Sequence, residues 1–468
     1  MVYAILLNPD MPRSIPDKNR FVARNFPSLG VNSIACALRS KGHDVLVLDP
    51  LFLCLDSNSP RPIIDFAEYL RGCLGRARPD IVGITVVSPL RSLCLELAGI
   101  VKEFDRSIPV VLGGPHATAM YQQILLHYEG LVDAVVVGPG EKTFCRLAEM
   151  VEKRHKIEPV PGAALMDPKG DVVFLPTDPR KQNMMPPPDY LQYVSKSNAG
   201  FLPTAGLLTM TGCPFKCNFC SYRYFSFALR PKEEVLRDIS VLVDQYGVRN
   251  IHIHDSNFPF NRRRAQEILA AIEPMAPGTN LHIKSRFDLI DEGFLERFRA
   301  AGGKSIFFGL ESGSTAVLSN MNKLIPIEKV KSVAKATKRL GIGCYVFVIL
   351  GYPEETRRDI RATYDLLREI EPAGVYCSIT KFYPGTPLYE DAIRRGIMFE
   401  ESWLCDQRFF FAVGERELEL LYGLELLLNK EFGGPAPWAE YDLRLDDVPS
   451  TSPAEEAIAV EKARRLLA

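Results

Sequence analysis

The stretch Thr211-Gly-Cys-Pro-Phe-Lys-Cys-Asn-Phe-Cys-Ser-Tyr222 decides how the rest of the chain is interpreted. Its three cysteines, Cys213, Cys217 and Cys220, follow the spacing C-x3-C-x2-C within one short loop. Thiolates are soft ligands that suit iron–sulfur clusters and zinc. Three local cysteines can hold three corners of a [4Fe–4S] cluster and leave one iron open to chelate an amine and a carboxylate. The stretch therefore predicts a cluster-binding loop.

Two other interpretations of these thiols remain open at this point. A structural zinc site requires a fourth Cys or His ligand, which His252 or His254 could supply. Alternatively, the three cysteines are unrelated buried residues. The dense spacing favours the cluster over both. The other eight cysteines are dispersed and are expected to act as small core hydrophobes: Cys36, Cys54, Cys73, Cys94, Cys145, Cys344, Cys377 and Cys405.

The loop follows the first of six strand-like runs that alternate with amphipathic segments. The runs are Leu207–Met210, Asn250–His254, Leu281–Lys284, Ser305–Phe308, Gly343–Ile349 and Val375–Ile379. The segments between them include Lys232–Tyr246, Arg263–Met275, Asp291–Ala301, Ile327–Leu340 and Glu355–Glu371. Six parallel βα units predict a partial (β/α)6 TIM-like barrel over residues 201–395, with its chemistry at the C-terminal strand ends.

Residues 1–153 carry an earlier alternation of the same kind. Buried strands are expected at Val2–Leu7, Asp44–Leu48, Ile81–Thr85, Val110–Leu112 and Ala134–Val137, with helical spacing between them. This predicts an α/β fold with a Rossmann-like doubly wound sheet, which binds a ligand beyond its C-terminal strand ends. Glycines there allow a ligand to approach the backbone closely. The candidate contacts are Ser88, Gly113, Gly114, His116, Gly138, Gly140 and Glu141.

The remaining segments are less regular. Residues 154–200, which include Pro186-Pro-Pro188, are expected to form a linker with a small hairpin. Residues 396–468 are expected to form a helical cap or tail, acidic around Glu415–Glu425 and including a Pro/Ser/Asp stretch.

Composition excludes several classes of protein. The 468 residues carry 56 basic and 57 acidic side chains, a net charge of −1, so nucleic-acid binding is not expected. No apolar run approaches the roughly 18 residues of a membrane span, and the first residues do not resemble a signal peptide. Eleven cysteines, an odd and mostly dispersed set, argue against a disulfide framework. A reducing, cytoplasmic location is expected.

With its place after the first barrel strand, the cysteine loop resembles that of the radical S-adenosylmethionine (SAM) enzymes. The resemblance implies that Cys213, Cys217 and Cys220 ligate the cluster and that its open iron binds the methionine part of SAM. Reductive cleavage of SAM then gives a 5′-deoxyadenosyl radical that abstracts hydrogen from a small-molecule substrate. Phe219 would pack near the adenine, and Tyr222 is also expected to contact the cofactor.

Motifs at later strand ends resemble those of a large subgroup of these enzymes. They are His254-Asp-Ser-Asn-Phe258, Lys284-Ser-Arg286, Gly309-Leu-Glu-Ser-Gly-Ser314 and Gly351-Tyr-Pro-Glu-Glu355. The resemblance makes Asp255, Asn257, Arg286, Glu311, Ser312 and Gly351 candidate SAM contacts. We expect Glu311 and Arg286 to clamp the opposite charges of SAM. Taken singly, such residues also suit surface ion pairs or helix caps.

The N-terminal half resembles the cobalamin (B12)-binding domain of the same subgroup. The matching segments are Pro27-Ser-Leu-Gly30, Lys41-Gly-His-Asp-Val45, Gly113-Gly-Pro-His-Ala-Thr118 and Gly138-Pro-Gly-Glu141. The chain lacks a D-x-H-x-x-G motif, so no axial histidine is offered to cobalamin, and its last loop has Gly-Pro-Gly-Glu where the subgroup usually has Gly-Glu-Gly-Glu. The resemblance covers residues 1 to about 395.

This resemblance implies a cytoplasmic biosynthetic enzyme that uses a [4Fe–4S] cluster and SAM, with cobalamin-dependent C-methylation as the leading function. It also implies an electron donor such as flavodoxin or ferredoxin. The alternatives are a cobalamin-independent radical dehydratase, epimerase or rearrangement enzyme acting on a sugar or aminoglycoside, and a non-catalytic cobalamin or iron–sulfur sensor. Methylthiolation of tRNA is disfavoured, because a second cysteine triad is absent and the chain is not basic.

Overall fold

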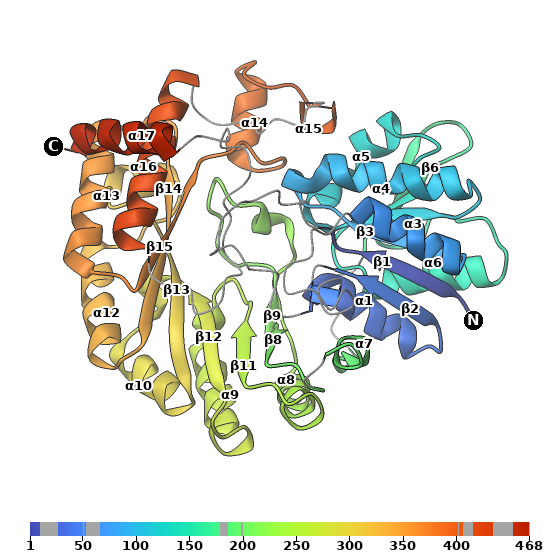
Figure 1. Ribbon diagram of the computed structural model, residues 1–468, viewed down its shortest axis with the longest axis horizontal. Helices are drawn as coiled ribbons and strands as arrows, with labels where there is room; N and C mark the ends of the chain where they lie inside the picture. The colour runs from blue at the N-terminus through green and yellow to red at the C-terminus, as the bar shows by residue number, and fades with distance from the viewer. Residues whose placement is uncertain are drawn as a thin grey trace. The chain divides into compact units, whose positions relative to one another are not determined.

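The chain folds into two compact units, each built on one main β-sheet (Figure 1). The computed structural model describes residues 1–9, 27–49, 51–52, 66–177, 186–197, 200–400, 402–405, 415–433 and 453–467. The first unit comprises residues 1–202, 244–247 and 392–407, and the second comprises residues 203–243, 248–391 and 408–468. The region expected to form one C-terminal cap is therefore divided between the two units.

The first unit is a doubly wound α/β fold with a seven-stranded sheet in the order β2-β1-β3-β4-β5-β6-β7. The strands are β1 (Tyr3–Leu7), β2 (Asp44–Leu48), β3 (Ile81–Thr85), β4 (Val110–Gly113), β5 (Ala134–Val136), β6 (Ala163–Met166) and β7 (Val172–Phe174). Strands β1 to β5 are parallel, whereas β6 and β7 are antiparallel. The hairpin expected in the linker is thus present, and it extends the sheet.

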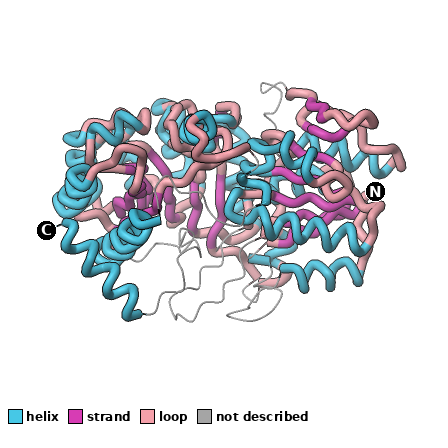
Figure 2. Tube along the Cα trace, turned by 90° about the horizontal axis from the view of Figure 1, so that it is seen from above, coloured by secondary structure: helices cyan, strands magenta, loops and turns pink. Residues whose placement is uncertain are grey.

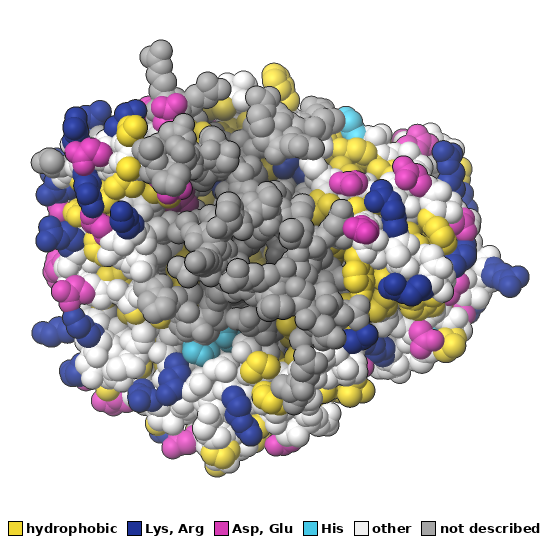
Figure 3. All heavy atoms as spheres, in the orientation of Figure 1, with side chains coloured by type: hydrophobic (Ala, Val, Ile, Leu, Met, Phe, Trp, Pro, Cys, Tyr) yellow, Lys and Arg dark blue, Asp and Glu magenta, His cyan; other side chains and the backbone are white. Residues whose placement is uncertain are grey.

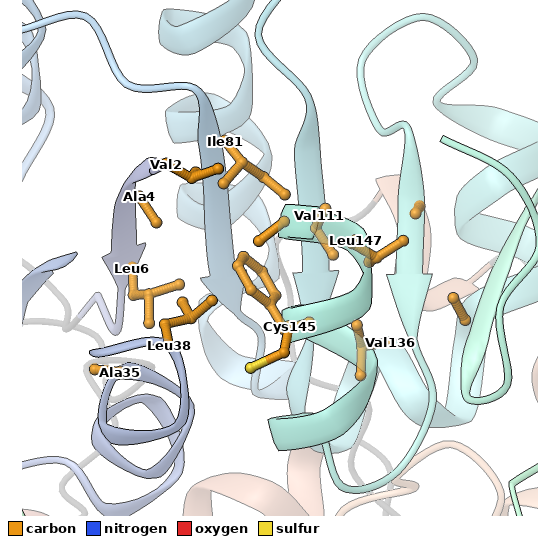
Figure 4. Packing of buried hydrophobic residues seen from close by; sticks show 14 of the residues in the cluster. Val2, Ala4, Leu6, Ala35, Leu38, Ile81, Val111, Val136, Cys145 and Leu147 are labelled. Carbon is orange, nitrogen blue, oxygen red and sulfur yellow. The ribbon is translucent and has the colours of Figure 1, made fainter. Parts of the chain in front are cut away.

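Helices cover both faces of this sheet (Figure 2). They are α1 (Leu29–Arg39), α3 (Phe66–Arg76), α4 (Arg91–Phe104), α5 (Gly114–His127), α6 (Glu141–Glu152) and the short α7 (Leu191–Val194) and α15 (Ser402–Cys405). Figure 4 shows Leu38 of α1 and Leu147 of α6 packed over strand residues such as Leu6 and Val111. The strands read as continuous apolar runs because both of their faces are buried.

The second unit is a partial barrel whose parallel six-stranded sheet has the order β15-β14-β13-β12-β11-β8. The strands are β8 (Thr204–Leu207), β11 (Asn250–Ile253), β12 (Asn280–Ser285), β13 (Gly303–Glu311), β14 (Gly343–Leu350) and β15 (Gly374–Ile379). A separate pair, β9 (Met210–Thr211) and β10 (Ala228–Leu229), is antiparallel. The fold class and five of the six predicted strands are confirmed. The first strand was predicted at Leu207–Met210 but is β8 at Thr204–Leu207, because Met210 pairs with β10 in the separate antiparallel pair.

Helices line the outer face of the six-stranded sheet (Figure 1). They include α8 (Lys232–Ser240), α9 (Arg262–Met275), α10 (Glu292–Ala300), α12 (Ile327–Arg339) and α13 (Arg357–Ile370). The unit also contains α11 (Thr315–Asn320), α14 (Pro387–Arg394), α16 (Glu415–Phe432) and α17 (Pro453–Leu467). Several begin at side-chain caps: Asn261 accepts from the Arg264 amide and Asp291 from the Phe294 amide. No helix in the described ranges is both long and apolar enough to cross a membrane.

Basic and acidic side chains are interspersed over the face of the molecule shown in Figure 3. No extended basic surface stands out among the coloured side chains of that view. This distribution agrees with the net charge of −1.

Candidate active site

The cysteine loop is closed at its base by the pairing of β9 with β10. Thr211 lies opposite Ala228 in this antiparallel pair, so the residues between them form one closed loop beyond the end of β8. The thiols of Cys213, Cys217 and Cys220 are free and partly exposed. The six other cysteines whose side chains are described are buried, as predicted for core hydrophobes: Cys36, Cys73, Cys94, Cys145, Cys344 and Cys377. Cys54 and the side chain of Cys405 lie outside the described residues.

The three loop thiols differ in their surroundings. Burial raises the pKa of the Cys220 thiol to about 11. Burial also raises the pKa of the Cys217 thiol, and the positive charges of Lys323 and Arg286 partly offset this increase. The amide nitrogen Nδ2 of Asn257 donates to Cys213 Sγ at 3.5 Å. A partly exposed loop of thiols beside fixed cations suits the assembly of a negatively charged thiolate cluster.

The same loop does not suit a single metal ion. Within the described ranges, no three His, Cys, Asp or Glu side chains converge closely enough to hold one ion. A zinc ion needs such convergence, whereas a cubane cluster binds its thiolates at separate corners. His252 and His254, the expected fourth ligands for zinc, lie on β11 or at its end, and their rings stack on each other at 5.9 Å. The zinc interpretation therefore has no support in this geometry.

Asp255, a candidate SAM contact, supports the backbone that leads into the cysteine loop. It is 1% exposed, and its Oδ1 accepts hydrogen bonds from the amides of Thr209 at 2.7 Å and Met210 at 3.2 Å. Its other oxygen accepts from the Thr209 hydroxyl. Burial raises the pKa of Asp255 to about 6 despite these bonds. The adjacent Ser256 hydroxyl donates to the carbonyl of Gly212 at 3.2 Å, so this turn anchors the start of the loop.

Arg286 and Glu311, the expected SAM clamp, are buried, and each has a protein partner of opposite charge. Arg286 donates from two nitrogens to Asp288 at 2.9 and 3.0 Å, and its guanidinium lies 4.1 Å from the ring centre of Phe215 in the cysteine loop. Glu311 accepts from Lys323 Nζ at 2.5 Å. Neither Asp288 nor Lys323 was predicted from the sequence as part of this site.

Two other candidate SAM contacts maintain backbone geometry. Ser312 is fully buried; its hydroxyl accepts from the Ser314 amide at 3.1 Å and lies 3.2 Å from the Thr363 hydroxyl. Gly351 has a φ of +68° and donates its amide to Glu355 at 2.6 Å. Burial raises the pKa of Glu355 to about 7. Both residues lie at C-terminal strand ends, as expected.

The two aromatic candidates in the cysteine loop have different environments. Phe219 lies beside the buried Lys323, whose Nζ is 6.0 Å from the centre of the ring. Tyr222, by contrast, is 50% exposed, and its ring centre lies 5.8 Å from that of Phe225. Phe219 is thus close to the Glu311–Lys323 pair, and Tyr222 lies at the surface of the loop.

The inner face of the six-stranded sheet carries histidines and a lysine at one side and aromatic rings at the other. Strand register places His252 beside His282, and Lys284 beside Phe307. The ring of Phe307 stacks on that of Tyr345 at 4.9 Å, and the Phe347 and Tyr376 rings lie 5.6 Å apart. Burial lowers the pKa of His252 to about 3 and that of His282 to about 2, so both imidazoles are neutral hydrogen-bonding groups at pH 7.

The first unit has a pocket at the C-terminal ends of its strands, with a cavity volume of about 160 Å³. Five of the predicted ligand contacts line it: Gly113, Gly114, Gly138, Gly140 and Glu141. Gly114 has a φ of +90°, and a Cβ there would lie 2.6 Å from the Thr85 hydroxyl, so only glycine fits. Glu141 accepts a hydrogen bond from the Ser33 hydroxyl at 2.7 Å.

Ser88 and His116, the other two predicted contacts of this unit, bond to each other, and the His116 ring faces away from that pocket. The Ser88 hydroxyl lies 3.0 Å from His116 Nδ1, and burial lowers the pKa of His116 to about 3. The His116 ring packs edge-on against Trp403 of α15, and the Arg91 guanidinium lies 4.7 Å from the Trp403 ring centre. His116, Arg91 and Trp403 line a separate cavity of about 10 Å³. The place of Trp403 in this unit was not predicted from the sequence.

Two family models match the chain, one in each of its two units. Residues 207–367 match the radical SAM superfamily, and residues 21–148 match the B12 binding domain. An uncharacterized methyltransferase of Pyrococcus horikoshii is 29% identical over 391 residues, which cover 82% of each protein. An anaerobic magnesium-protoporphyrin IX monomethyl ester cyclase of Rubrivivax gelatinosus is 28% identical over 79% of this chain and 67% of its own length.

Solved structures with the same fold are more distant in sequence. The radical SAM methyltransferase TsrM of Kitasatospora setae aligns with a TM-score of 0.67 at 20% identity, over 84% of this chain and 76% of its own. The cobalamin-dependent SAM radical enzyme OxsB aligns with a TM-score of 0.70 at 18% identity, over 92% of this chain and 67% of its own.

The barrel, its cysteine loop and the matched family define a radical SAM enzyme. A B12-binding domain at residues 21–148 precedes the radical SAM domain at residues 207–367 in this chain. The radical SAM domain implies a [4Fe–4S] cluster and SAM as cofactors, the B12-binding domain supports cobalamin, and the substrate is a small molecule.

Proposed function

We propose that this chain is a cobalamin-dependent C-methyltransferase that acts on a small biosynthetic metabolite. The observation that carries the proposal is the presence of a glycine-lined pocket in a B12-type unit together with a three-cysteine loop in a radical SAM barrel. The methyltransferases among its relatives support the same reaction type. When bound, the cofactors supply the methyl group and the radical chemistry, and the protein binds, orients and shields the reactants.

We infer that the cluster is held by Cys213, Cys217 and Cys220, with Asn257 donating to the Cys213 sulfur. SAM is then bound at the ends of β12, β13 and β14. Candidate contacts there are Arg286, Glu311, Ser312 and Gly351, with Phe219 and Tyr222 contributed by the loop. Asp255 acts through the backbone, because its oxygens accept hydrogen bonds from Thr209 and Met210.

We infer that cobalamin occupies the pocket of the first unit against Gly113, Gly114, Gly138, Gly140 and Glu141. The cavity volume of about 160 Å³ suits one arm of a large ligand rather than the whole molecule. Ser88 and His116 then support the unit by packing and hydrogen bonding without contacting cobalamin, because the His116 ring packs against Trp403.

The substrate is proposed to contact the inner face of the six-stranded sheet. The aromatic rings of β13, β14 and β15 offer stacking and apolar contact, and the histidines and Lys284 offer hydrogen bonds. A one-electron donor such as flavodoxin or ferredoxin in the cytoplasm is part of the proposal. Among the described residues the buried cysteines of both units form no disulfide, which supports such a reducing compartment.

The test separates methyl transfer from other radical chemistry. Protein reconstituted with iron, sulfide and hydroxocobalamin is incubated anaerobically with SAM and a chemical reductant. We expect S-adenosylhomocysteine to form only when cobalamin is bound, and 5′-deoxyadenosine only when the cluster is present. Formation of 5′-deoxyadenosine without S-adenosylhomocysteine would contradict methyl transfer. It would favour a non-methylating reaction, of the kind named for the magnesium-protoporphyrin cyclase relatives.

A further inference from the structure

Lys323 is a buried lysine of the barrel unit, and it lies shortly after the short helix α11. Its Nζ lies 2.5 Å from Glu311 Oε1, and the two side chains are only 6% and 9% exposed. Burying two charges is costly unless they are paired in good geometry. A buried pair at the end of β13 therefore indicates that each charge is needed at this place.

Lys323 also contacts the two structures beside it. Its Nζ lies 6.0 Å from the ring centre of Phe219, between the second and third loop cysteines. A Cβ at Gly309 would lie 2.4 Å from Lys323 Nζ and 2.6 Å from Glu311 Oε1, so the glycine leaves the space in which the two charged groups meet. The ammonium group is thus held between β13 and the cysteine loop.

The turn that carries Lys323 is bonded to the cysteine loop by three hydrogen bonds. The Asn218 amide donates to the Met321 carbonyl at 2.9 Å, and Asn218 Nδ2 donates to the Asn320 carbonyl at 2.9 Å. Asn322 Nδ2 donates in return to the Lys216 carbonyl at 2.8 Å. These bonds join segments about a hundred residues apart in sequence, so the position of Lys323 relative to the cysteines is fixed.

The charge of Lys323 acts on the cysteine loop. Its buried Nζ lies 6.0 Å from the ring centre of Phe219, which stands between Cys217 and Cys220 in the loop. Three thiolates give a cluster site negative charge, and each added electron makes that charge greater. A fixed cation in a buried environment stabilises the more negative, reduced state.

We propose that Lys323 is a positioning residue of the cluster and SAM site. It holds the Glu311 carboxylate in the orientation needed to bind SAM, and it offsets the negative charge of the cysteine loop. This inference depends on the radical SAM site alone and not on methyl transfer, so its failure is distinguishable from failure of the proposed function.

The test uses the full chain, reconstituted anaerobically, in four variants: Lys323→Met, Lys323→Arg, Glu311→Gln and the double variant Glu311→Gln/Lys323→Met. The matched control is Lys338→Met, which breaks an exposed ion pair with Glu371. The measurements are iron per chain, the dissociation constant of SAM and the cluster midpoint potential followed by electron paramagnetic resonance. None of them depends on a substrate or on cobalamin.

We expect Lys323→Met to weaken SAM binding by about tenfold or more and to lower the midpoint potential. Lys323→Arg should restore both values toward those of the wild type, because it keeps the charge. Glu311→Gln should raise the potential, and the double variant should return it to the wild-type value while SAM binding stays weak. Lys338→Met should change neither quantity.

Two results would overturn the proposal. One is wild-type SAM affinity and potential in Lys323→Met, which would leave Lys323 a purely structural role. The second result applies if Lys323→Met loses its cluster because Glu311 is left buried and unpaired. The double variant removes that unpaired charge. The charge effect is then refuted if the wild type, Glu311→Gln and the double variant all have the same midpoint potential.

Discussion

Replacing Trp403 by alanine should release the segment around α15 from the first unit. The Trp403 side chain is fully buried, lies 4.7 Å from the Arg91 guanidinium and packs on His116. Truncating a buried Trp to Ala costs about 3–5 kcal/mol, and a cation–π contact adds about 0.5–2 kcal/mol. The loss cannot exceed the free energy that docks the segment, because a short helix can detach without the sheet unfolding. We therefore expect about 3 kcal/mol, at the lower end of this range.

The assay is hydrogen exchange followed by mass spectrometry on the full chain. A loss of 3 kcal/mol corresponds to more than a hundredfold faster exchange in peptides from residues 392–407 and in α4 and α5, which they cover. Peptides from the six-stranded sheet should exchange at wild-type rates. Local exchange is preferable to a single unfolding curve, because a chain of two units need not unfold in two states.

Phe399→Ala is the matched control, because Phe399 lies in the same segment but is 70% exposed. It should change local stability by no more than about 0.5 kcal/mol. Equal exchange in the two variants would refute the reasoning, since it would mean that burial of Trp403 does not hold the segment in place. Faster exchange confined to the six-stranded sheet would refute the assignment of the segment to the first unit.

Three further predictions address the cofactors and the titration of the site. Replacing all three loop cysteines by alanine should abolish the iron–sulfur absorbance and SAM cleavage together, whereas Cys94→Ser should leave about four irons per chain; a cluster retained by the triple variant would contradict the assignment. Gly114→Ala should destabilise the first unit by about 1–3 kcal/mol and weaken hydroxocobalamin binding measured by absorbance. Gly130→Ala, also at positive φ but in open space, should destabilise the unit without weakening hydroxocobalamin binding. Equal binding by the two variants would contradict the assignment of the pocket to cobalamin. Burial raises the pKa of Glu355 in the folded protein from 4.5 to about 7, so the free energy of unfolding should fall as pH rises from about 4.5 to 7. In urea unfolding, Glu355→Gln should lose this part of the pH dependence. An unchanged pH dependence in the variant would contradict the role of Glu355.

The parts of the fold set by local patterns could be predicted from the sequence. Apolar runs separated by amphipathic segments gave both sheets, because buried parallel strands and their covering helices each leave a local periodicity. The cysteine loop was likewise recognisable, since all three thiols lie within eight residues of sequence and follow a strand. The glycines of the first unit were proposed from their place at predicted strand ends; among them, Gly114 has a positive φ and a close contact with Thr85 that exclude other residues.

The partners of the charged residues could not be predicted in the same way. Glu311 and Lys323 are twelve residues apart, and only the fold of β13 and α11 brings their charges together. Asp255 could equally have faced a ligand, because an aspartate after a strand serves either role until the backbone amides near it are placed. Trp403 gave no signal, because its contacts are with residues nearly three hundred positions earlier in the chain.

The first unit is assembled from segments that are widely separated in the chain, and this affects how the protein is made. Residues 203–243 and 248–391, which belong to the barrel, are translated before the segment that carries Trp403. At about 5–20 residues per second, the nascent B12-type unit waits roughly 10–40 s for its last piece. During that time the apolar hollow between α4 and α5 is exposed to solvent and to chaperones. For the same reason, cutting the chain near residue 200 cannot yield a complete cobalamin unit, whereas adding residues 392–407 as a separate peptide offers a way to restore it.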